Sequence, residues 1–330
     1  MQNRNPPVSK RPEARPLLSS VPRGGALGGL RTRAPRAAAT AGTTTEPASS
    51  QVEARRRLLA KLSKVRPMSA TAQRVLALTG GEDAQVPAIA DAIAGDPALA
   101  TETLRLANSA VYRRAYPIED IKRAVMTLGL DQLHSMATAM ALLGTVSSEH
   151  PLFDDLHASS VLGATLAGLL TTELYEVEKS TAFVAGLLAE MGAMACLMLD
   201  DDYAAILRAH ALAPLERERV ELDTYGMTSW EVGGQLLAKN RVPDSIVEAV
   251  KQPSDLQGRE VPLLSRIVVF TRAAAPLILA TEKEGGLSDA RERLDAIARL
   301  AGLEIGSETL LALCDWATSS ASFMTRPTRG

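Results

Sequence analysis

Aromatic residues make up only 3% of this 330-residue chain. The β-branched residues typical of strands are sparse beside the many Ala and Leu residues, which are strong helix formers. No segment alternates polar and apolar residues between hairpin turns, as strands exposed on one face would. The composition therefore excludes an all-β fold and predicts an all-α protein.

Cysteine and histidine are also scarce, with two and four residues. Cys196 and Cys314 lie far apart in apolar contexts, so they form neither a metal-type spacing nor a disulfide framework. We expect two buried free thiols and a cytoplasmic location. His134, His150 and His210 do not sit at ligand spacing with another histidine.

A long uninterrupted apolar run is missing as well. The best candidate for a membrane span, residues 183–199, is interrupted by Glu190. A carboxylate in the middle of a span is costly, so a buried core helix is the better interpretation. The Arg- and Pro-rich N-terminus has no continuous apolar segment and is not expected to be a secretory signal.

Charge is unevenly distributed along the chain. Residues 1–50 hold eight basic and two acidic residues, a net charge of +6, and the remainder holds 28 basic and 36 acidic residues, a net charge of −8. The acidic body argues against nucleic-acid binding by the folded part. Segment 1–54, rich in Pro, Gly and Arg, is predicted to be a disordered tail that tethers the protein or provides a second contact.

From about residue 55, apolar residues recur at helical spacing. Two units are predicted, a helical domain over 55–260 and C-terminal helices over 261–325 that pack on it. Expected helices cover residues 86–93, 119–128, 131–146, 155–175, 178–199, 201–211, 215–223, 228–240, 243–251, 261–282, 288–301 and 307–323, and another begins at Asp96-Pro97.

Three segments in the expected order resemble the HDOD family: Asp96-Pro97-Ala98-Leu99 with Leu104 to Ala110, then Pro117-Ile118 with Leu128-Gly129-Leu130, then Phe183 to Leu188. The resemblance spans about residues 58–255. It implies an orthogonal helical bundle related to HD phosphohydrolases. It also implies an output or interaction module of bacterial signalling, in a branch that usually has no demonstrated catalysis.

In HD hydrolases, imidazoles and carboxylates hold divalent ions that activate water. By the resemblance, the corresponding positions here are Ser159, Ala189, Glu190, Ser229 and Gln252. Four of these five residues replace an expected imidazole. We therefore predict no catalytic residue, no metal and no cofactor, and we regard these five positions as vestigial.

The sequence leaves three functions open. The favoured one is a non-catalytic regulatory module that binds a signalling protein of unknown identity. An alternative is a sensor that binds a cyclic dinucleotide or guanosine tetraphosphate without hydrolysis. The third is a residual hydrolase that uses Glu190, His157 and Asp154 or Asp155. Candidate interaction residues, each of which could instead have a structural role, are Arg105, Asn108, Tyr112, Arg113 and Arg114.

Overall fold

The computed structural model describes residues 49–65, 74–75, 78, 85–95, 100–101, 103–104, 107–108, 117–146, 149–240, 242–282 and 287–325. Throughout this part of the chain the elements are helices, and no strand occurs, which confirms the predicted all-α class. Residues 1–48 of the predicted tail lie outside the described residues. The boundary at residue 54 needs correction, because the first helix begins at Ser49.

The described helices follow the predicted order, with most ends within a few residues of the expected ones. Their bounds are α1 (Ser49–Leu62), α3 (Val86–Ala94), α5 (Ile121–Leu128), α6 (Leu130–Leu143), α7 (Leu152–Leu170), α8 (Lys179–Leu188), α9 (Met191–Leu199), α10 (Tyr203–His210), α11 (Pro214–Tyr225), α12 (Ser229–Lys239), α13 (Asp244–Val250), α14 (Leu263–Glu282), the 3₁₀ turn η2 (Leu287–Ala290), α15 (Arg291–Leu300) and α16 (Ser307–Thr325).

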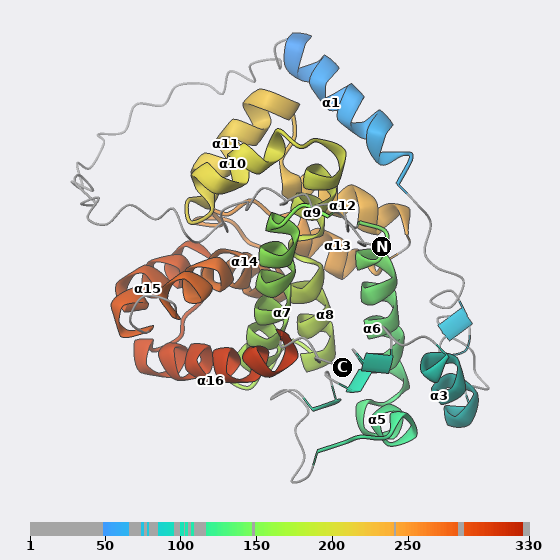
Figure 1. Cartoon of the computed structure of the whole chain (residues 1–330). Helices are drawn as coiled ribbons and strands as arrows, with labels where there is room; N and C mark the ends of the chain where they lie inside the picture. Colours follow the sequence, from blue (N-terminus) through green and yellow to red (C-terminus); the bar gives the residue numbers. More distant parts are fainter. Residues whose placement is uncertain are drawn as a thin grey trace, which may run out of the picture.

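Helices α7 and α8 lie side by side at the centre of the bundle (Figure 1). A helix that is apolar on every face belongs in a core, and most of α7 is buried. Small residues allow the two helices to touch: a Cβ added at Gly186 would lie 2.8 Å from the carbonyl oxygen of Gly163. This contact fixes the position of the chain segment that follows α8.

The predicted continuous helix over 178–199 is wrong, because the chain turns at Ala189 and Glu190 and divides it into α8 and α9. The turn directs α9 against α12, where backbones almost touch. A Cβ added at Gly192 would lie 1.8 Å from the carbonyl oxygen of Ser229. The local sequence is compatible with helix throughout, so the break is a consequence of tertiary packing.

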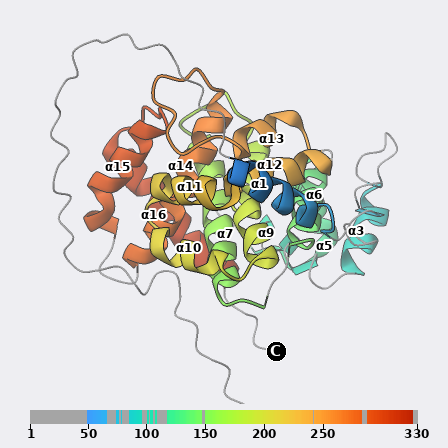
Figure 2. The same cartoon turned by 90° about the horizontal axis from the view of Figure 1, so that it is seen from above.

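The remaining helices surround this centre. Helices α14 and α16 pack against α7, while α3, α5 and α6 lie on the opposite side from α15 and α16 (Figures 1 and 2).

Two stretches, Lys179–Leu199 and Leu263–Glu282, are long and apolar enough to cross a membrane. Most of each stretch is buried within the bundle, however, and core helices share this composition. Cys196 and Cys314 are both free and buried, as expected.

Helix α1 packs across α9 and α11. The α1 side chains of Leu58 and Leu62 are buried in this contact, and the Lys61 ammonium donates to the carbonyl oxygen of Leu199 (3.2 Å) at the end of α9. At Gly226, which ends α11 with a φ of +67°, a Cβ would lie 2.2 Å from the carbonyl oxygen of Gln51. Both packing and a left-handed backbone therefore require glycine at this junction.

The contact between α9 and α12 generates a prediction about stability. Gly192→Ala is expected to lower the free energy of unfolding by about 3 kcal/mol or more, because the new methyl group would overlap the Ser229 backbone. Urea unfolding followed by circular dichroism measures the change. Gly95→Ala is the control, since among the described residues the nearest atoms to its Cβ would lie 3.5 Å away; equal losses in the two variants would contradict the packing argument.

Candidate functional site

Helix α11 turns a charged face toward the interior. Arg217, Glu218 and Glu221 are buried, whereas Leu215 and Leu222 on the same helix are 45% and 42% exposed. This inverts the usual amphipathic arrangement. Buried charges require partners, so the structure around α11 must supply them.

Glu221 joins α11 to α10 and α12. It accepts hydrogen bonds from the Tyr203 hydroxyl (2.6 Å), the Ser229 backbone N–H (2.7 Å) and the Ser229 hydroxyl (3.1 Å). Ser229 is the first residue of α12, where helix backbone N–H groups need acceptors and a negative charge is favourable. Burial and the Glu221 carboxylate both raise the pKa of Tyr203, so its hydroxyl remains a donor.

Glu218 joins α11 to α12 and to the loop after α13. It accepts hydrogen bonds from the indole Nε1 of Trp230, the Ser254 backbone N–H (2.7 Å) and the Ser254 hydroxyl (2.5 Å). Three donors thus surround this carboxylate as well. Both acids are satisfied in the interior by neutral donors from neighbouring elements.

Two guanidinium groups stack on the buried indole ring of Trp230. The Arg217 Cζ lies 4.2 Å and the Arg272 Cζ 3.7 Å from the ring centroid, both within range of a cation–π interaction. Arg272 comes from α14 and donates to the carbonyl oxygens of Val250 (2.9 Å) and Gln252 (2.7 Å) at the end of α13. Burial lowers the pKa of Arg272 to about 10, so the group remains a cation near neutral pH.

Glu190, at the turn between α8 and α9, completes an ionic cluster that we define as Glu190, Arg217, Glu218, Glu221 and Arg272. Its Oε2 lies 3.8 Å from the Arg217 Nη2, and no hydrogen bond from the described residues reaches that oxygen. Burial raises the pKa of Glu190 despite the nearby cations Arg217 and Arg272. Burial alone would lower the pKa of Arg217, but its carboxylate neighbours outweigh that effect and raise it.

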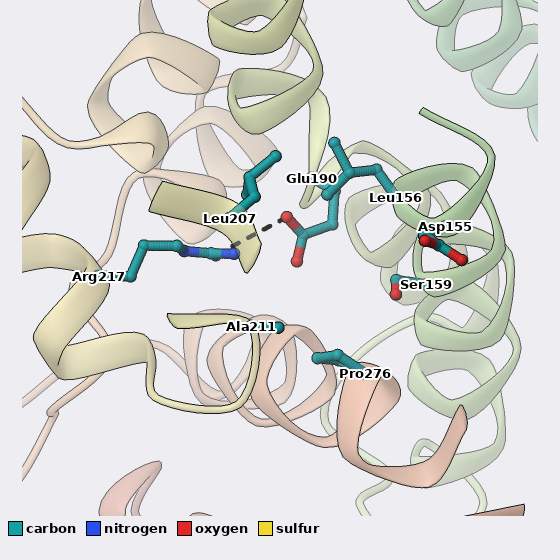
Figure 3. Close-up of a pocket in the computed structure, with 8 residues that line it drawn as sticks. All are labelled: Asp155, Leu156, Ser159, Glu190, Leu207, Ala211, Arg217 and Pro276. Atoms are coloured by element: carbon teal, nitrogen blue, oxygen red, sulfur yellow. Dashed lines mark ion pairs between the residues drawn. The ribbon is translucent and has the colours of Figure 1, made fainter. Parts of the chain in front are cut away.

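Glu190 borders a cavity of about 20 Å³ between α7, α10, α11 and α14 (Figure 3). Ser159 and Asp155 from α7 face the same space, and Arg217 lies on the far side of Glu190 (Figure 3). Apolar side chains complete the lining. The full set is Asp155, Leu156, Ser159, Glu190, Leu207, Ala211, Arg217 and Pro276.

The structure brings together some of the five predicted vestigial positions. Ser159 and Glu190 line the same cavity, and Ala189 is buried beside Glu190. Ser229 is buried and bonded to Glu221, away from the cavity lining. The Gln252 side chain donates instead to the Glu248 carbonyl oxygen at an exposed position.

These positions do not fit a divalent ion. Alanine offers no donor, the Ser229 hydroxyl is committed to Glu221, and Glu190 faces the Arg217 guanidinium. Among the described residues, no three or more His, Cys, Asp or Glu side chains form a group that could hold a metal. His157 does not line the cavity, and of the two acids in the residual-hydrolase hypothesis only Asp155 does.

Of the five candidate interaction residues, the structure describes Asn108. Its side chain donates to the carbonyl oxygens of Leu104 (2.9 Å) and Ile118 (2.7 Å) and accepts from the Ile118 backbone N–H (2.7 Å). These bonds join two chain segments, which is the structural role that the sequence also allowed. Arg105, Tyr112, Arg113 and Arg114 lie outside the described residues, so their contact with a partner stays a prediction.

Sequence reasoning missed most of the ionic cluster and the residues that bond to it. Helix α11 has the charge density of a solvated helix, which conceals the role of Arg217, Glu218 and Glu221. A usable signal was present in α14, where Arg272 follows a strongly apolar run from Ile267 to Phe270. A charge inside such a run is expected to have a buried partner.

The cluster generates a prediction about α11. Glu221→Gln is expected to lower the free energy of unfolding by about 3 kcal/mol, because an amide cannot accept all three hydrogen bonds or balance Arg217. Glu216→Gln is the control on the same helix, where a 61% exposed side chain should change stability by less than about 0.5 kcal/mol. Chemical denaturation compares them; similar effects would refute the assigned role of Glu221.

Known proteins resemble this chain in sequence and in fold. A profile of the HDOD domain family matches residues 65–256, more than half of the chain. No relative was found among curated proteins. A protein of Shewanella amazonensis SB2B, provisionally named a phosphohydrolase, superposes with a TM-score of 0.64 at 23% identity, covering 81% of this chain and 96% of its own.

Two further solved structures have related folds. An HDOD domain protein of unknown function from Geobacter sulfurreducens has a TM-score of 0.58 at 21% identity, covering 83% of this chain and 97% of its own. A Marinobacter aquaeolei VT8 protein is provisionally named a signal transduction protein. It has a TM-score of 0.55 at 19% identity, and the match covers 84% of this chain and 67% of the Marinobacter chain. These structures share the fold, and the match over residues 65–256 shows that the chain belongs to the HDOD domain family.

Proposed function

We propose that this chain is a non-catalytic regulatory module of bacterial signal transduction that acts by binding another protein. The observation that carries the proposal is the ionic cluster. At the place where the family resemblance puts metal ligands, the chain has one carboxylate opposite a guanidinium and a serine bonded to a second carboxylate. The name of the Marinobacter relative supports a signalling role.

The chemistry of the cluster argues against water activation. A hydrolytic metal needs several anionic or imidazole ligands and an exchangeable water. Arg217 and Arg272 already place two buried positive charges beside the carboxylates. A divalent ion would have to displace or repel these two cations, and the remaining donors are too few to compensate for that cost.

The size of the cavity argues against nucleotide binding at the same place. Small-molecule pockets usually have volumes of about 300–1,000 Å³. The cavity beside Glu190 has about 20 Å³, which is room for a single water molecule. To bind at this cavity, a cyclic dinucleotide or guanosine tetraphosphate would need the bundle to open, so we favour protein recognition over a sensor that uses this site.

The proposal includes a cytoplasmic location, supported by two free thiols that are both buried. Burial raises the pKa of Cys196 well above its ordinary value and that of Cys314 to about 12. Neutral buried thiols of this kind are unreactive. We therefore assign Cys196 and Cys314 to packing and give them no role in redox sensing.

The non-catalytic assignment predicts the metal content of the purified protein. After incubation with Mn²⁺ and gel filtration, elemental analysis should find far less than one ion per chain, and no phosphodiester or nucleotide substrate should be turned over. An HD hydrolase of known activity treated in parallel is the positive control. Stoichiometric metal together with turnover, both abolished by Glu190→Ala, would reverse the assignment.

The proposed tether predicts a role for the basic N-terminal segment. A variant that lacks residues 1–48 and starts at α1 should recover less partner protein from cell lysate than the full chain, with recovery by the full chain falling as salt rises. Circular dichroism and thermal unfolding should be unchanged and serve as the folding control. Equal recovery by both proteins would remove the tether from the proposal.

A further inference from the structure

The ionic cluster contains more acids than bases. Glu190, Glu218 and Glu221 are all buried, and two guanidinium groups, of Arg217 and Arg272, are buried with them. With every group ionised, the cluster would carry one net negative charge in the protein interior. A buried unbalanced charge is costly, and a carboxyl group in this position commonly retains its proton.

The hydrogen bonds indicate which carboxyl that is. Glu218 and Glu221 each accept three hydrogen bonds, and such bonds stabilise the ionised form. Glu190 differs, since its Oε2 accepts none from the described residues and lies 3.8 Å from the nearest Arg217 nitrogen. At that separation a guanidinium attracts the group without a hydrogen bond.

The same side chain faces the cavity. Glu190 reaches this space from the turn between α8 and α9, and Ser159 reaches it from α7 (Figure 3). The volume of about 20 Å³ suits a single water molecule. A buried water needs two to four polar partners. The Ser159 hydroxyl and the Glu190 carboxyl provide them, with Asp155 at the border of the cavity.

We infer that Glu190 is a proton-binding site, neutral at physiological pH, whose carboxyl group donates a hydrogen bond to one water molecule held against Ser159. The proton balances the charge of the cluster without a metal ion. The direction of the pKa of Glu190 agrees, since burial raises it although Arg217 and Arg272 oppose the change. The inference goes beyond the proposed function and does not require it.

Four neighbouring groups, Cys196, Tyr203, Arg217 and Arg272, do not account for a titration near neutral pH. The pKa of Cys196 and that of Tyr203 are both raised far above neutrality by burial, and the two arginines remain cations. The charged and titratable groups that face the site are Asp155 on α7, Cys196 on α9, Tyr203 on α10, Arg217, Glu218 and Glu221 on α11, and Arg272 on α14.

The inference fixes the sign of a pH effect on stability. The ordinary pKa of a glutamate is 4.5, and the folded state raises that of Glu190. At a pH below this ordinary value, Glu190 holds its proton in both the folded and the unfolded state, and its full contribution to the free energy of unfolding is present. As pH rises further, the unfolded state loses the proton first. The contribution of Glu190 then falls, by up to about tenfold in the unfolding constant per pH unit, until the folded-state pKa is passed.

Glu190→Gln tests the inference because glutamine is a neutral replacement of the same shape. At about pH 7 the variant should match the wild-type unfolding constant within a few-fold or be more stable. Between about pH 5 and 7 it should lack the part of the wild-type slope due to Glu190. If Glu190 is ionised and needed by Arg217, the variant will instead lose as much stability as Glu221→Gln, and that result would overturn the inference.

Infrared spectroscopy detects the proton directly. The wild type at neutral pH should show the carbonyl stretch of a carboxylic acid, and the band should be missing in Glu190→Gln and retained in Glu216→Gln. A metal-free wild type without the band overturns this inference alone. A crystal structure should show one water beside Ser159; a metal ion there would overturn both this inference and the proposed function.

Discussion

The Arg217 and Arg272 guanidinium groups link the helices that meet at the ionic cluster. Each stacks on Trp230, and each reaches an element that the other does not: Arg217 the turn at Glu190, and Arg272 the end of α13. Burying two arginines beside three glutamates is favourable only when the charges balance and the carboxylates have hydrogen-bond donors. The ionic cluster therefore couples the positions of α9, α11, α12, α13 and α14.

The helices could be predicted because their signals are local. Leu and Ala at helical spacing, Pro214 at the start of α11 and Gly226 at its end all follow from backbone chemistry within a few residues. The break between α8 and α9 could not be predicted in the same way. Ala189, Glu190 and Met191 are good helix formers, and the turn there depends on the approach of Gly192 to Ser229, 37 residues away in the sequence.

The sequence predicted where the candidate site lies but did not identify most of the residues that form it. Motif alignment identified Ser159 and Glu190, and these residues do face one cavity. It could not identify Arg217, because the Glu- and Arg-rich sequence of α11 is also typical of a helix in water. Only tertiary structure reveals that Glu218 and Glu221 point inward while Leu215 and Leu222 remain exposed. Periodicity measures how residues are spaced and cannot tell which face of a mixed helix is buried.

Arg272 extends the functional unit beyond the residues that match the family. The match ends at residue 256, whereas α14 begins at Leu263 and supplies both Arg272 and Pro276 to the site. A guanidinium differs from a metal ion in a way that matters here: it is covalently attached and has no exchangeable ligand position, so it can balance carboxylates but cannot bind and ionise water. In the function proposed above, a site built on Arg217 and Arg272 keeps the helices of an HD-type fold in place and takes no part in hydrolysis. What such a fold retains is its surface, and this is why protein recognition is the function that its chemistry favours.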